Sequence, residues 1–264
     1  MSELVLRAGA WAQVTPESAG WQHLSFSVRR GPFVADSGED EIAIVVLGGR
    51  CRVGAEGEEW ELGRRDSVFA GMPWSLYLPR DTRYSVEGDA EIAICGARCT
   101  RRGEPRPIPP DQVEVEIRGA GNATRQINHI IKPDFPAERL LVVEAFTPSG
   151  NWSSYPPHKH DEDNPPTEVV LEETYYFRTG GFALQRLYSP RHALDLTCTV
   201  TDGDLLLVPY GYHTTAAAHG YDLYYLNALA GERRSMASAD DPALHWTREA
   251  WATLVPDPRV PLVS

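Results

Sequence analysis

Short apolar runs recur along most of this chain, and glycine or proline separates one run from the next. Runs of this length, rich in β-branched and aromatic residues, predict strands joined by tight turns, as do the 21 prolines and 22 glycines. The predicted strands are residues 41–47, 67–70, 75–78, 90–94, 140–146, 173–177, 181–188, 205–209 and 221–227. Residues 242–254, with Trp246 and Trp251, are the best helix candidate. The pattern predicts an all-β fold with a short C-terminal helix.

A proline-rich segment divides the chain into two parts. Residues 105–110 contain four prolines. Proline fixes φ and removes a backbone donor, so this segment can form neither a helix nor a central strand. We therefore predict an extended linker at residues 103–112, between an N-terminal domain, residues 1–102, and a C-terminal domain, residues 113–264.

The two parts resemble weak repeats of each other. Glu41 precedes Gly48 by the same spacing with which Glu173 precedes Gly180, and similar turns and apolar runs follow in both halves. Histidines distinguish the halves, because the first has no His-x-His before Glu41 and none at the place corresponding to His213. We expect a metal only in the second half, with the first as a structural or dimerising copy.

Composition and charge exclude several classes of function. Lys and Arg number 25 against 37 Asp and Glu, giving a net charge of −12, which argues against nucleic acid or an anionic membrane as partner. The chain has no apolar run long enough to span a membrane. The start, Met1-Ser2-Glu3-Leu4, lacks a basic region and an apolar core, so we expect no signal peptide. Four cysteines without a Cys-x-x-Cys pair fit a reducing cytoplasm.

A candidate metal-ligand set lies in the second half. His158 and His160 are two residues apart, so on a strand both point to the same face, while the lysine between them points away. Glu172 or Glu173 and then His213 follow. Imidazole nitrogen and carboxylate oxygen suit zinc, iron(II), nickel or manganese. Three histidines and one carboxylate leave positions on the metal for water or substrate.

These spacings resemble the two motifs of cupins. His-x-His and Glu-x6-Gly match the first motif, and residues 203–213, Gly-x5-Pro-x-Gly-x-His, match the second. The chain departs from the usual pattern in having one residue fewer before His213, no later asparagine, and an 11-residue gap between His160 and Glu172. In cupins these motifs lie on the inner face of a small antiparallel barrel.

Longer segments are similar to the 5-deoxy-glucuronate isomerases of myo-inositol breakdown. The matching segments are residues 150–161, 171–178, 181–186, 202–213 and 221–227. The resemblance covers essentially the whole chain and implies a bicupin, with two antiparallel β-barrels of the jelly-roll type. It also implies a sugar-acid isomerase that interconverts 5-deoxy-D-glucuronate and 5-dehydro-2-deoxy-D-gluconate. A related isomerase of pectin breakdown is a zinc bicupin, so zinc is the first choice of divalent metal, with iron(II), manganese and nickel as alternatives.

Two adjacent glutamates compete for the carboxylate position. Generic cupin spacing and the internal match to Glu41 favour Glu173, whereas alignment of Tyr176 and Phe177 with the pectin-pathway relative favours Glu172. Neighbouring strand residues face opposite sides, so only one of the two should bind the metal. We lean to Glu173 and keep both as candidates.

The implied substrate carries a carboxylate and hydroxyls, which calls for cationic and polar partners. The candidate catalytic residues are Tyr176, Gln185 and Arg178, and the candidate substrate-binding residues are Arg125, Tyr155 and Tyr212. For each arginine the alternative is an ordinary surface position, and for each tyrosine it is packing of the barrel. The acidic residues 161–166 fit a solvated loop or a lid.

The implied reaction moves a carbonyl between adjacent carbons of an open-chain sugar acid. A Lewis acid would stabilise the negative charge of an enediolate, and the sequence leaves open whether a base or a hydride shift moves the hydrogen. The alternatives are an iron(II) dioxygenase or another uronate isomerase on the same barrel, or a non-catalytic sugar-binding cupin. We further expect a homo-oligomer formed through barrel edges.

Overall fold

The computed structural model describes residues 4–264, and nearly all of its regular structure is strand. The first barrel contains β2 (Gln13–Val14), β3 (Leu24–Arg30), β4 (Phe33–Asp36), β5 (Asp40–Ala55), β6 (Glu58–Arg65), β7 (Ser75–Leu78), β8 (Arg83–Gly88), β9 (Glu91–Arg98) and β10 (Arg106–Ile108). The second contains β1 (Val5–Leu6), β11 (Glu114–Arg118), β12 (Arg125–Ile131), β13 (Leu140–Thr147), β14 (Trp152–Lys159), β15 (Glu172–Thr179), β16 (Phe182–Ser189), β17 (Leu194–Thr201), β18 (Leu205–Val208), β19 (Tyr212–Ala217), β20 (Leu223–Ala230) and β21 (Ala239–Asp240). The helical elements are α1 (Pro16–Ala19), η1 (Val68–Ala70), η2 (Pro110–Gln112), η3 (Pro190–His192), α2 (Trp246–Glu249) and η4 (Ala250–Thr253).

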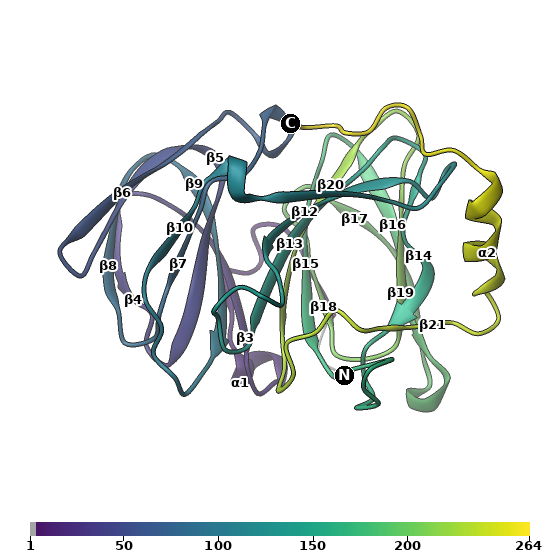
Figure 1. The fold of residues 1–264 in the computed structure, drawn as a ribbon, viewed down its shortest axis with the longest axis horizontal. Helices are drawn as coiled ribbons and strands as arrows, with labels where there is room; N and C mark the ends of the chain where they lie inside the picture. Colours follow the sequence, from purple (N-terminus) through teal and green to yellow (C-terminus); the bar gives the residue numbers. More distant parts are fainter. Residues whose placement is uncertain (1–3) are drawn as a thin grey trace.

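The strands form two antiparallel barrels that lie side by side (Figure 1). In the first barrel, one sheet runs β10-β7-β5-β9-β3-β2, and the far end of the long strand β5 pairs with β6 and β8. The second barrel has a sheet β1-β18-β15-β20-β13-β12-β11 facing a sheet β17-β16-β19-β14-β21. The predicted all-β fold with two antiparallel barrels and a short C-terminal helix is therefore confirmed.

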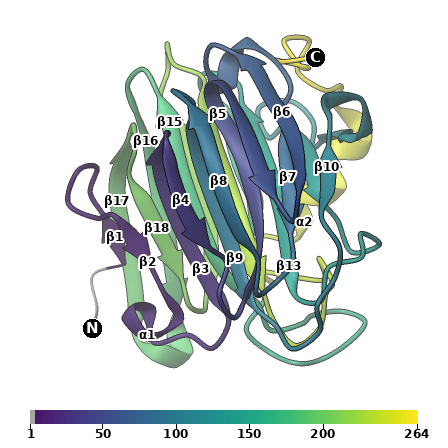
Figure 2. The same cartoon turned by 90° about the vertical axis from the view of Figure 1, so that its left-hand side faces the viewer.

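The two barrels share a continuous apolar junction (Figure 2 views it from the side of the first barrel). Phe26 and Val45 of the first barrel belong to the same buried cluster as Phe146, Tyr176 and Tyr224 of the second. Because β13 and β20 face the junction on one side and their own barrel on the other, every residue of both strands is buried. Such strands read as continuous apolar runs rather than as an alternation.

A buried ion pair also crosses the junction. Nη2 of Arg65, in the first barrel, lies 3.0 Å from Oε2 of Glu144, in the second, and both side chains are almost fully buried. Tyr224 and Asn128 donate further hydrogen bonds to Glu144. A buried pair of this kind needs these additional partners, because burial removes the hydration of both charges.

The N-terminal strand crosses between the two parts on either side of the predicted linker. β1 pairs with β18 of the second barrel, although it comes from the first part of the chain. β10, inside the proline-rich segment, pairs with β7 at a sheet edge, a position where proline is tolerated. The backbone amides of Leu262 and Val263, near the C-terminus, donate hydrogen bonds to Gln126 of β12. The division into domains at residues 103–112 stays a prediction.

Two expectations about membranes and targeting can be placed on the structure. Within residues 4–264, no helix is both long enough and apolar enough to cross a membrane. The expectation that no signal peptide is present concerns Met1, Ser2 and Glu3, which lie outside the described residues.

Candidate metal centre

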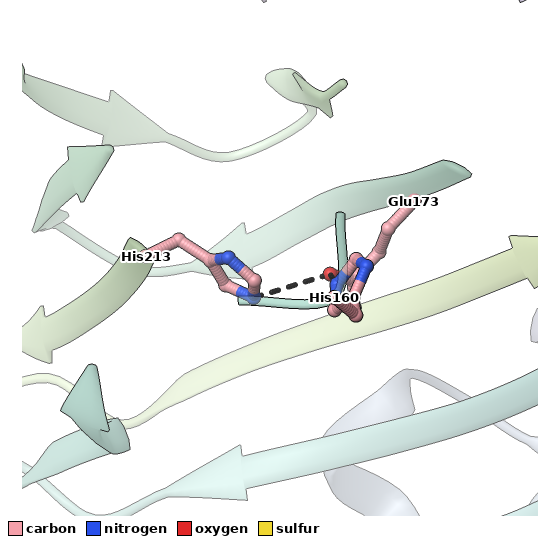
Figure 3. A group of neighbouring side chains, drawn as sticks. All are labelled: His160, Glu173 and His213. Carbon is pink, nitrogen blue, oxygen red and sulfur yellow. Dashed lines mark hydrogen bonds and ion pairs between the residues drawn. The ribbon is translucent and has the colours of Figure 1, made fainter. Parts of the chain in front are cut away.

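Three buried side chains from different parts of the second barrel meet at one point. His160 Nε2 lies 2.9 Å, and His213 Nε2 3.2 Å, from Oε2 of Glu173. His160 follows β14, Glu173 lies on β15 and His213 on β19, so the two facing sheets both contribute (Figure 3). One ligand atom from each residue lies within 4.8 Å of the others.

The strand pattern explains why these side chains point inward. Along β15, Glu173 and then Tyr175 and Phe177 face the interior of the second barrel, since alternate residues share a face. On β19, His213 lies opposite His158 of β14 and Leu187 of β16. The predicted ligands from distant segments are thereby brought together.

His158 lies beside this group rather than within it. Its ring centroid is 4.5 Å from that of His213 and 6.3 Å from that of His160. Among the described residues, the set of ligand atoms within 4.8 Å of one another consists of His160, Glu173 and His213. Burial and the neighbouring His213 and His160 hold the pKa of His158 well below its ordinary value. A neutral imidazole at this place keeps a lone pair for a cation.

The hydrogen bonds of the two rings show which nitrogens are free. Nδ1 of His160 lies 2.9 Å from the carbonyl of Leu171, and Nδ1 of His213 lies 3.1 Å from the carbonyl of Gly211. Because a carbonyl only accepts, each Nδ1 carries the hydrogen, and in a neutral ring Nε2 then carries the lone pair. Metal-binding histidines are commonly oriented by such a bond from the other ring nitrogen.

The converging atoms call for a positive charge between them. His213 Nε2 is buried and makes no hydrogen bond of acceptable geometry within residues 4–264, although Glu173 lies close by. Burial opposes ionisation of Glu173, but the neighbouring His160 and His213 outweigh it and lower the pKa of Glu173 to about 2. Two imidazole nitrogens and one carboxylate oxygen are suitable ligands for zinc, iron(II), manganese or nickel. The residues present fit a divalent metal ion.

A polar network ties the two histidine segments together. Lys159 Nζ lies 2.7 Å from Oδ1 of Asp161 and 2.8 Å from Oε1 of the buried Glu168. Asp161 Oδ2 in turn accepts a 2.8 Å hydrogen bond from the amide of Gly211, whose carbonyl accepts from His213. Lys159 thus points away from the metal-ligand group, and its partners connect the His160 segment to the His213 segment.

The structure distinguishes the two candidate glutamates. Glu172 accepts hydrogen bonds of 2.6, 3.0 and 2.8 Å from the amides of Gln22, His23 and Leu24 in the first barrel. Its carboxylate therefore faces the junction between the barrels. Glu173, and not Glu172, lies with the histidines.

Tyr176 and Arg178 share the junction face of β15 with Glu172. Tyr176 packs against Phe26 at a ring-centroid distance of 5.8 Å. Arg178 donates 2.8 Å hydrogen bonds to Glu91 of the first barrel and to Asp202. This placement does not support the predicted catalytic roles of Tyr176 and Arg178, because neighbouring residues of a strand point to opposite faces and only the face of Glu173 meets the histidines.

Two other predicted site residues, Gln185 and Tyr212, lie on opposite sides of the wall of the second barrel. Gln185 is buried within the barrel, where its Oε1 accepts from Thr215 and its Nε2 donates to the carbonyl of Arg186. Tyr212 faces away from the neighbouring His213 and packs on Tyr188 at 5.5 Å between ring centroids, which corrects its expected place in the pocket.

Tyr155 contributes its backbone to the site through Arg125. The phenol ring of Tyr155 packs against Trp152, 5.3 Å away between centroids, while its carbonyl accepts a 3.3 Å hydrogen bond from Nη1 of Arg125. The same Nη1 donates to the carbonyl of Ala123 at 3.2 Å. Tyr155 therefore orients Arg125 through its main-chain carbonyl, whereas its side chain was expected to bind the substrate.

Arg125 is a buried cation without a paired anion. Only 4% of its surface is exposed. Among residues 4–264 its Nε and Nη2 make no hydrogen bond and no carboxylate lies within ion-pair distance. Burial lowers the pKa of Arg125 to about 10, so it remains charged at neutral pH. The Tyr155 carbonyl that Arg125 contacts belongs to β14, the strand that also carries His158.

Two tyrosines of the site were not among the predicted residues. The ring of Tyr175 lies 5.7 Å from that of His213, and its Oη is 3.0 Å from Oγ of Ser154. Tyr225 lies beside it, 4.8 Å between centroids, and hydrogen-bonds Ser153. Alternate residues of a strand share a face, so Tyr175 points inward with Glu173. Tyr175 would have been predicted instead of Tyr176 if the sequence had shown which face of β15 points into the barrel.

Several known proteins are similar to this chain over nearly its whole length. Residues 4–247 match the model of the KduI/IolB family. A 5-deoxy-glucuronate isomerase from Geobacillus kaustophilus is 44% identical over 253 residues, 92% of this chain and 92% of that protein. A 5-deoxy-glucuronate isomerase from Bacillus subtilis (strain 168) is 36% identical over 249 residues, 90% of this chain and 92% of that protein.

Solved structures with the same arrangement of strands include one relative and one distant protein. An IolB-like protein from Salmonella typhimurium has a TM-score of 0.89 and 35% identity, covering 93% of this chain and 99% of that chain. Oxalate decarboxylase from Lactobacillus farciminis has a TM-score of 0.61 at 14% identity, covering 86% of this chain and 82% of that chain. The second likeness concerns the fold alone, and it confirms the predicted cupin architecture.

Proposed function

Because this chain belongs to the KduI/IolB family, we propose that it is a metal-dependent aldose–ketose isomerase acting on 5-deoxy-D-glucuronate. The product would be 5-dehydro-2-deoxy-D-gluconate, as a step in myo-inositol catabolism. Relatives at 36–44% identity are named 5-deoxy-glucuronate isomerases, and the chain is an isomerase of that family. The observation that carries the proposal is a buried metal-ligand group, His160, Glu173 and His213, in the same barrel as the unpaired Arg125.

Arg125 is the proposed partner of the substrate carboxylate. Its guanidinium is held in place by two backbone carbonyls through Nη1, which leaves Nε and Nη2 for an anion. A planar guanidinium binds a carboxylate through two parallel hydrogen bonds, and burial strengthens that pair. The substrate would then lie with its carboxylate at Arg125 and its reacting carbons toward the metal-ligand group.

The reacting end of the substrate would lie among residues that hold oxygen atoms. His160, Glu173, His213 and the adjacent His158 would hold a divalent ion, which supplies Lewis-acid stabilisation of negative charge on substrate oxygens. Burial raises the pKa of Tyr175 well above its ordinary value, so Oη keeps its proton and acts as a hydrogen-bond donor rather than as a base. Gln185, inside the same barrel, is held by Thr215 and can orient a hydroxyl or water.

The test is turnover of 5-deoxy-D-glucuronate followed by NMR. Purified protein of known metal content should convert the aldehyde to the ketone, whereas chelator-treated protein should not until zinc, iron(II), manganese or nickel is restored. The same reaction in D2O separates the two routes for hydrogen: proton abstraction incorporates deuterium into the product, and a hydride shift does not. Unchanged substrate with every metal would refute the proposed reaction.

A substitution tests the role of Arg125. Arg125→Ala should raise KM by roughly 10- to 100-fold while kcat falls less, because a carboxylate contact acts mainly in binding. Arg186→Ala is the matched control, since Arg186 lies exposed and is paired with Asp195. Equal kinetics for the two variants would contradict the assignment of Arg125.

Three expectations accompany the proposal. Zinc as the resident metal, a homo-oligomeric state and a cytoplasmic location stay predictions. Elemental analysis of the purified protein and light scattering at micromolar concentration test the first two.

A further inference from the structure

The C-terminal strap, residues 239–256, connects the two strands on which the site depends. At its start, β21 pairs with β14, with Asp240 opposite His158. At its end, the carbonyl of Val255 accepts a 2.8 Å hydrogen bond from the amide of Gly121, in the loop that leads into β12. Between these points α2 lies outside the second barrel, beside β14 and β16 (Figure 1). The strap is thus fixed at both ends close to site residues.

Charged contacts hold the middle of the strap in one conformation. Asp240 accepts hydrogen bonds of 2.8 and 2.7 Å from Nε and Nη2 of Arg248 and one of 2.9 Å from His245. The guanidinium of Arg248 lies 5.0 Å from the ring of Trp251, within the range of a cation–π contact. These contacts position Trp251 on the side of α2 and η4 that meets the barrel.

Trp251 reaches the unpaired arginine of the site. Its ring lies 5.9 Å from Cζ of Arg125, whose Nε and Nη2 make no hydrogen bond within residues 4–264. We propose that the strap is the outer wall of the substrate site and that Trp251 is a specificity residue, packing beside the carboxylate that Arg125 binds. This inference rests on the proposed function, because it requires an anionic sugar as substrate.

Trp251 beside Arg125 would favour an anionic ligand for two physical reasons, the positive charge of the arginine and the exclusion of water by the indole. An indole beside a guanidinium leaves the in-plane N–H groups free for a carboxylate, and it keeps water away from the ion pair. Arg248 adds a second positive charge, with its guanidinium 5.0 Å from the same indole ring. The acidic groups facing this region, Asp240 and Glu116, are already paired with Arg248 and Arg118. The wall therefore favours sugar acids over neutral sugars.

The match to the family model ends inside the strap. The family match ends at residue 247, and both Arg248 and Trp251 follow it. In the sequence, the region is a predicted helix with two tryptophans, and nothing in the pattern separates Trp246 from Trp251. The tertiary structure separates them, because Trp246 is 62% exposed, whereas Trp251 lies against two arginines.

The experiment compares these two tryptophans. Binding of D-glucuronate and of D-glucose to metal-loaded protein is measured by calorimetry, and KM for 5-deoxy-D-glucuronate is measured alongside. Trp251→Ala should weaken D-glucuronate binding and raise KM by roughly tenfold, with kcat little changed and D-glucose binding unaffected. Trp251→Phe should recover most of the loss, because it restores an aromatic face. Trp246→Ala is the matched control in the same strap and should match the unmodified protein.

The outcomes separate the two proposals. Equal binding and KM for Trp251→Ala and Trp246→Ala would overturn the role of the strap while leaving the isomerase function intact. Selective loss of D-glucuronate binding in Trp251→Ala, without turnover of 5-deoxy-D-glucuronate by any form, would support the strap and refute the proposed reaction. An unmodified protein that binds D-glucuronate no better than D-glucose and does not turn over 5-deoxy-D-glucuronate would overturn both.

Discussion

Glu41 in the first barrel and Glu172 in the second occupy equivalent places. Glu41 of β5 lies opposite Ala97 of β9, and Glu172 of β15 lies opposite Ala230 of β20. Each glutamate reaches across the junction to the other barrel. Glu41 accepts hydrogen bonds from the amides of residues 138–140, just where β13 begins, and Glu172 accepts from the amides of residues 22–24, where β3 begins. The two barrels hold each other by a reciprocal pair of carboxylates.

The next residue along each strand separates the barrels in function. Ile42 follows Glu41 and lies opposite Leu78, in the apolar interior of the first barrel. Glu173 follows Glu172 and lies opposite Val208, where it meets two histidines of the second barrel. One interior position thus holds an apolar packing residue in the first barrel and a candidate metal ligand in the second, while the junction position beside it is a glutamate in both.

This comparison also corrects the internal repeat read from the sequence. Equal spacing to a glycine matched Glu41 with Glu173, whereas strand register matches Glu41 with Glu172. The two glycines are not equivalent in register, because Gly48 lies opposite Glu91 of β9 after a shift between Val46 and Gly48, whereas Gly180 follows Thr179, the last paired residue of β15. Spacing along the chain therefore does not guarantee the same face of a strand.

The largest effect should come from removing a metal ligand of the second barrel. We expect His213→Ala to lower kcat/KM by roughly 1,000-fold or more, because Lewis-acid stabilisation is worth several kcal/mol. The fold should persist, since the two apolar barrels supply most of the burial. Steady-state kinetics and circular dichroism measure the two effects. The control is Tyr84→Phe in the first barrel, which should retain activity; full turnover by metal-free protein would contradict the mechanism.

The adjacent glutamates should separate metal binding from barrel contact. Glu173→Gln should weaken metal binding by at least about 100-fold, because it removes the charge between two imidazoles. Glu172→Gln should bind metal like the unmodified protein, because its carboxylate faces the first barrel. Competition with a chelator measures both affinities. Loss of metal in Glu172→Gln alone would reverse the assignment of the two residues.

The network around Lys159 should have a smaller influence on the same affinity. Asp161→Asn weakens the acceptor that holds the Gly211 amide, and Gly211 orients His213. We expect metal affinity to fall by roughly tenfold, a size typical of residues that orient ligands. Asp163→Asn is the control, since Asp163 lies in the same loop, is half exposed and pairs with Arg233 rather than with Lys159. Both variants are measured by the same chelator competition. If the network had no orienting role, their metal affinities would be equal.

The smallest effect should be on stability, and it should be alike in the two barrels. Glu41→Gln and Glu172→Gln each weaken charge-assisted hydrogen bonds to backbone amides, so each should lower the free energy of unfolding by about 1–3 kcal/mol. Denaturation in urea measures the loss. A large loss for one variant and none for the other would break the equivalence of the two carboxylates.

Most of the predicted strand segments are strands in the structure, although residues 68–70 form the helix η1, and local pattern also selected the candidate metal ligands His160 and His213. His158 and His160 share a face because alternate strand residues do, and the short apolar runs between turns predicted two antiparallel barrels once the motifs were recognised. The proline-rich segment and the restriction of the His-x-His motif to the second half were equally visible. These features depend on residues close together in the chain or on spacings typical of a known family.

The facing of β15 and the partners of its side chains were decided by the tertiary structure. Both faces of this strand are covered, one by its own barrel and the other by the first barrel, so apolar and polar residues do not alternate along it. The sequence therefore could not separate Glu173 from Glu172 or Tyr175 from Tyr176. Arg178 finds its partner Glu91 across the junction, 87 residues away. Arg125 and Trp251 meet only because the strap folds back onto β12, and such long-range contacts leave no local pattern in the sequence.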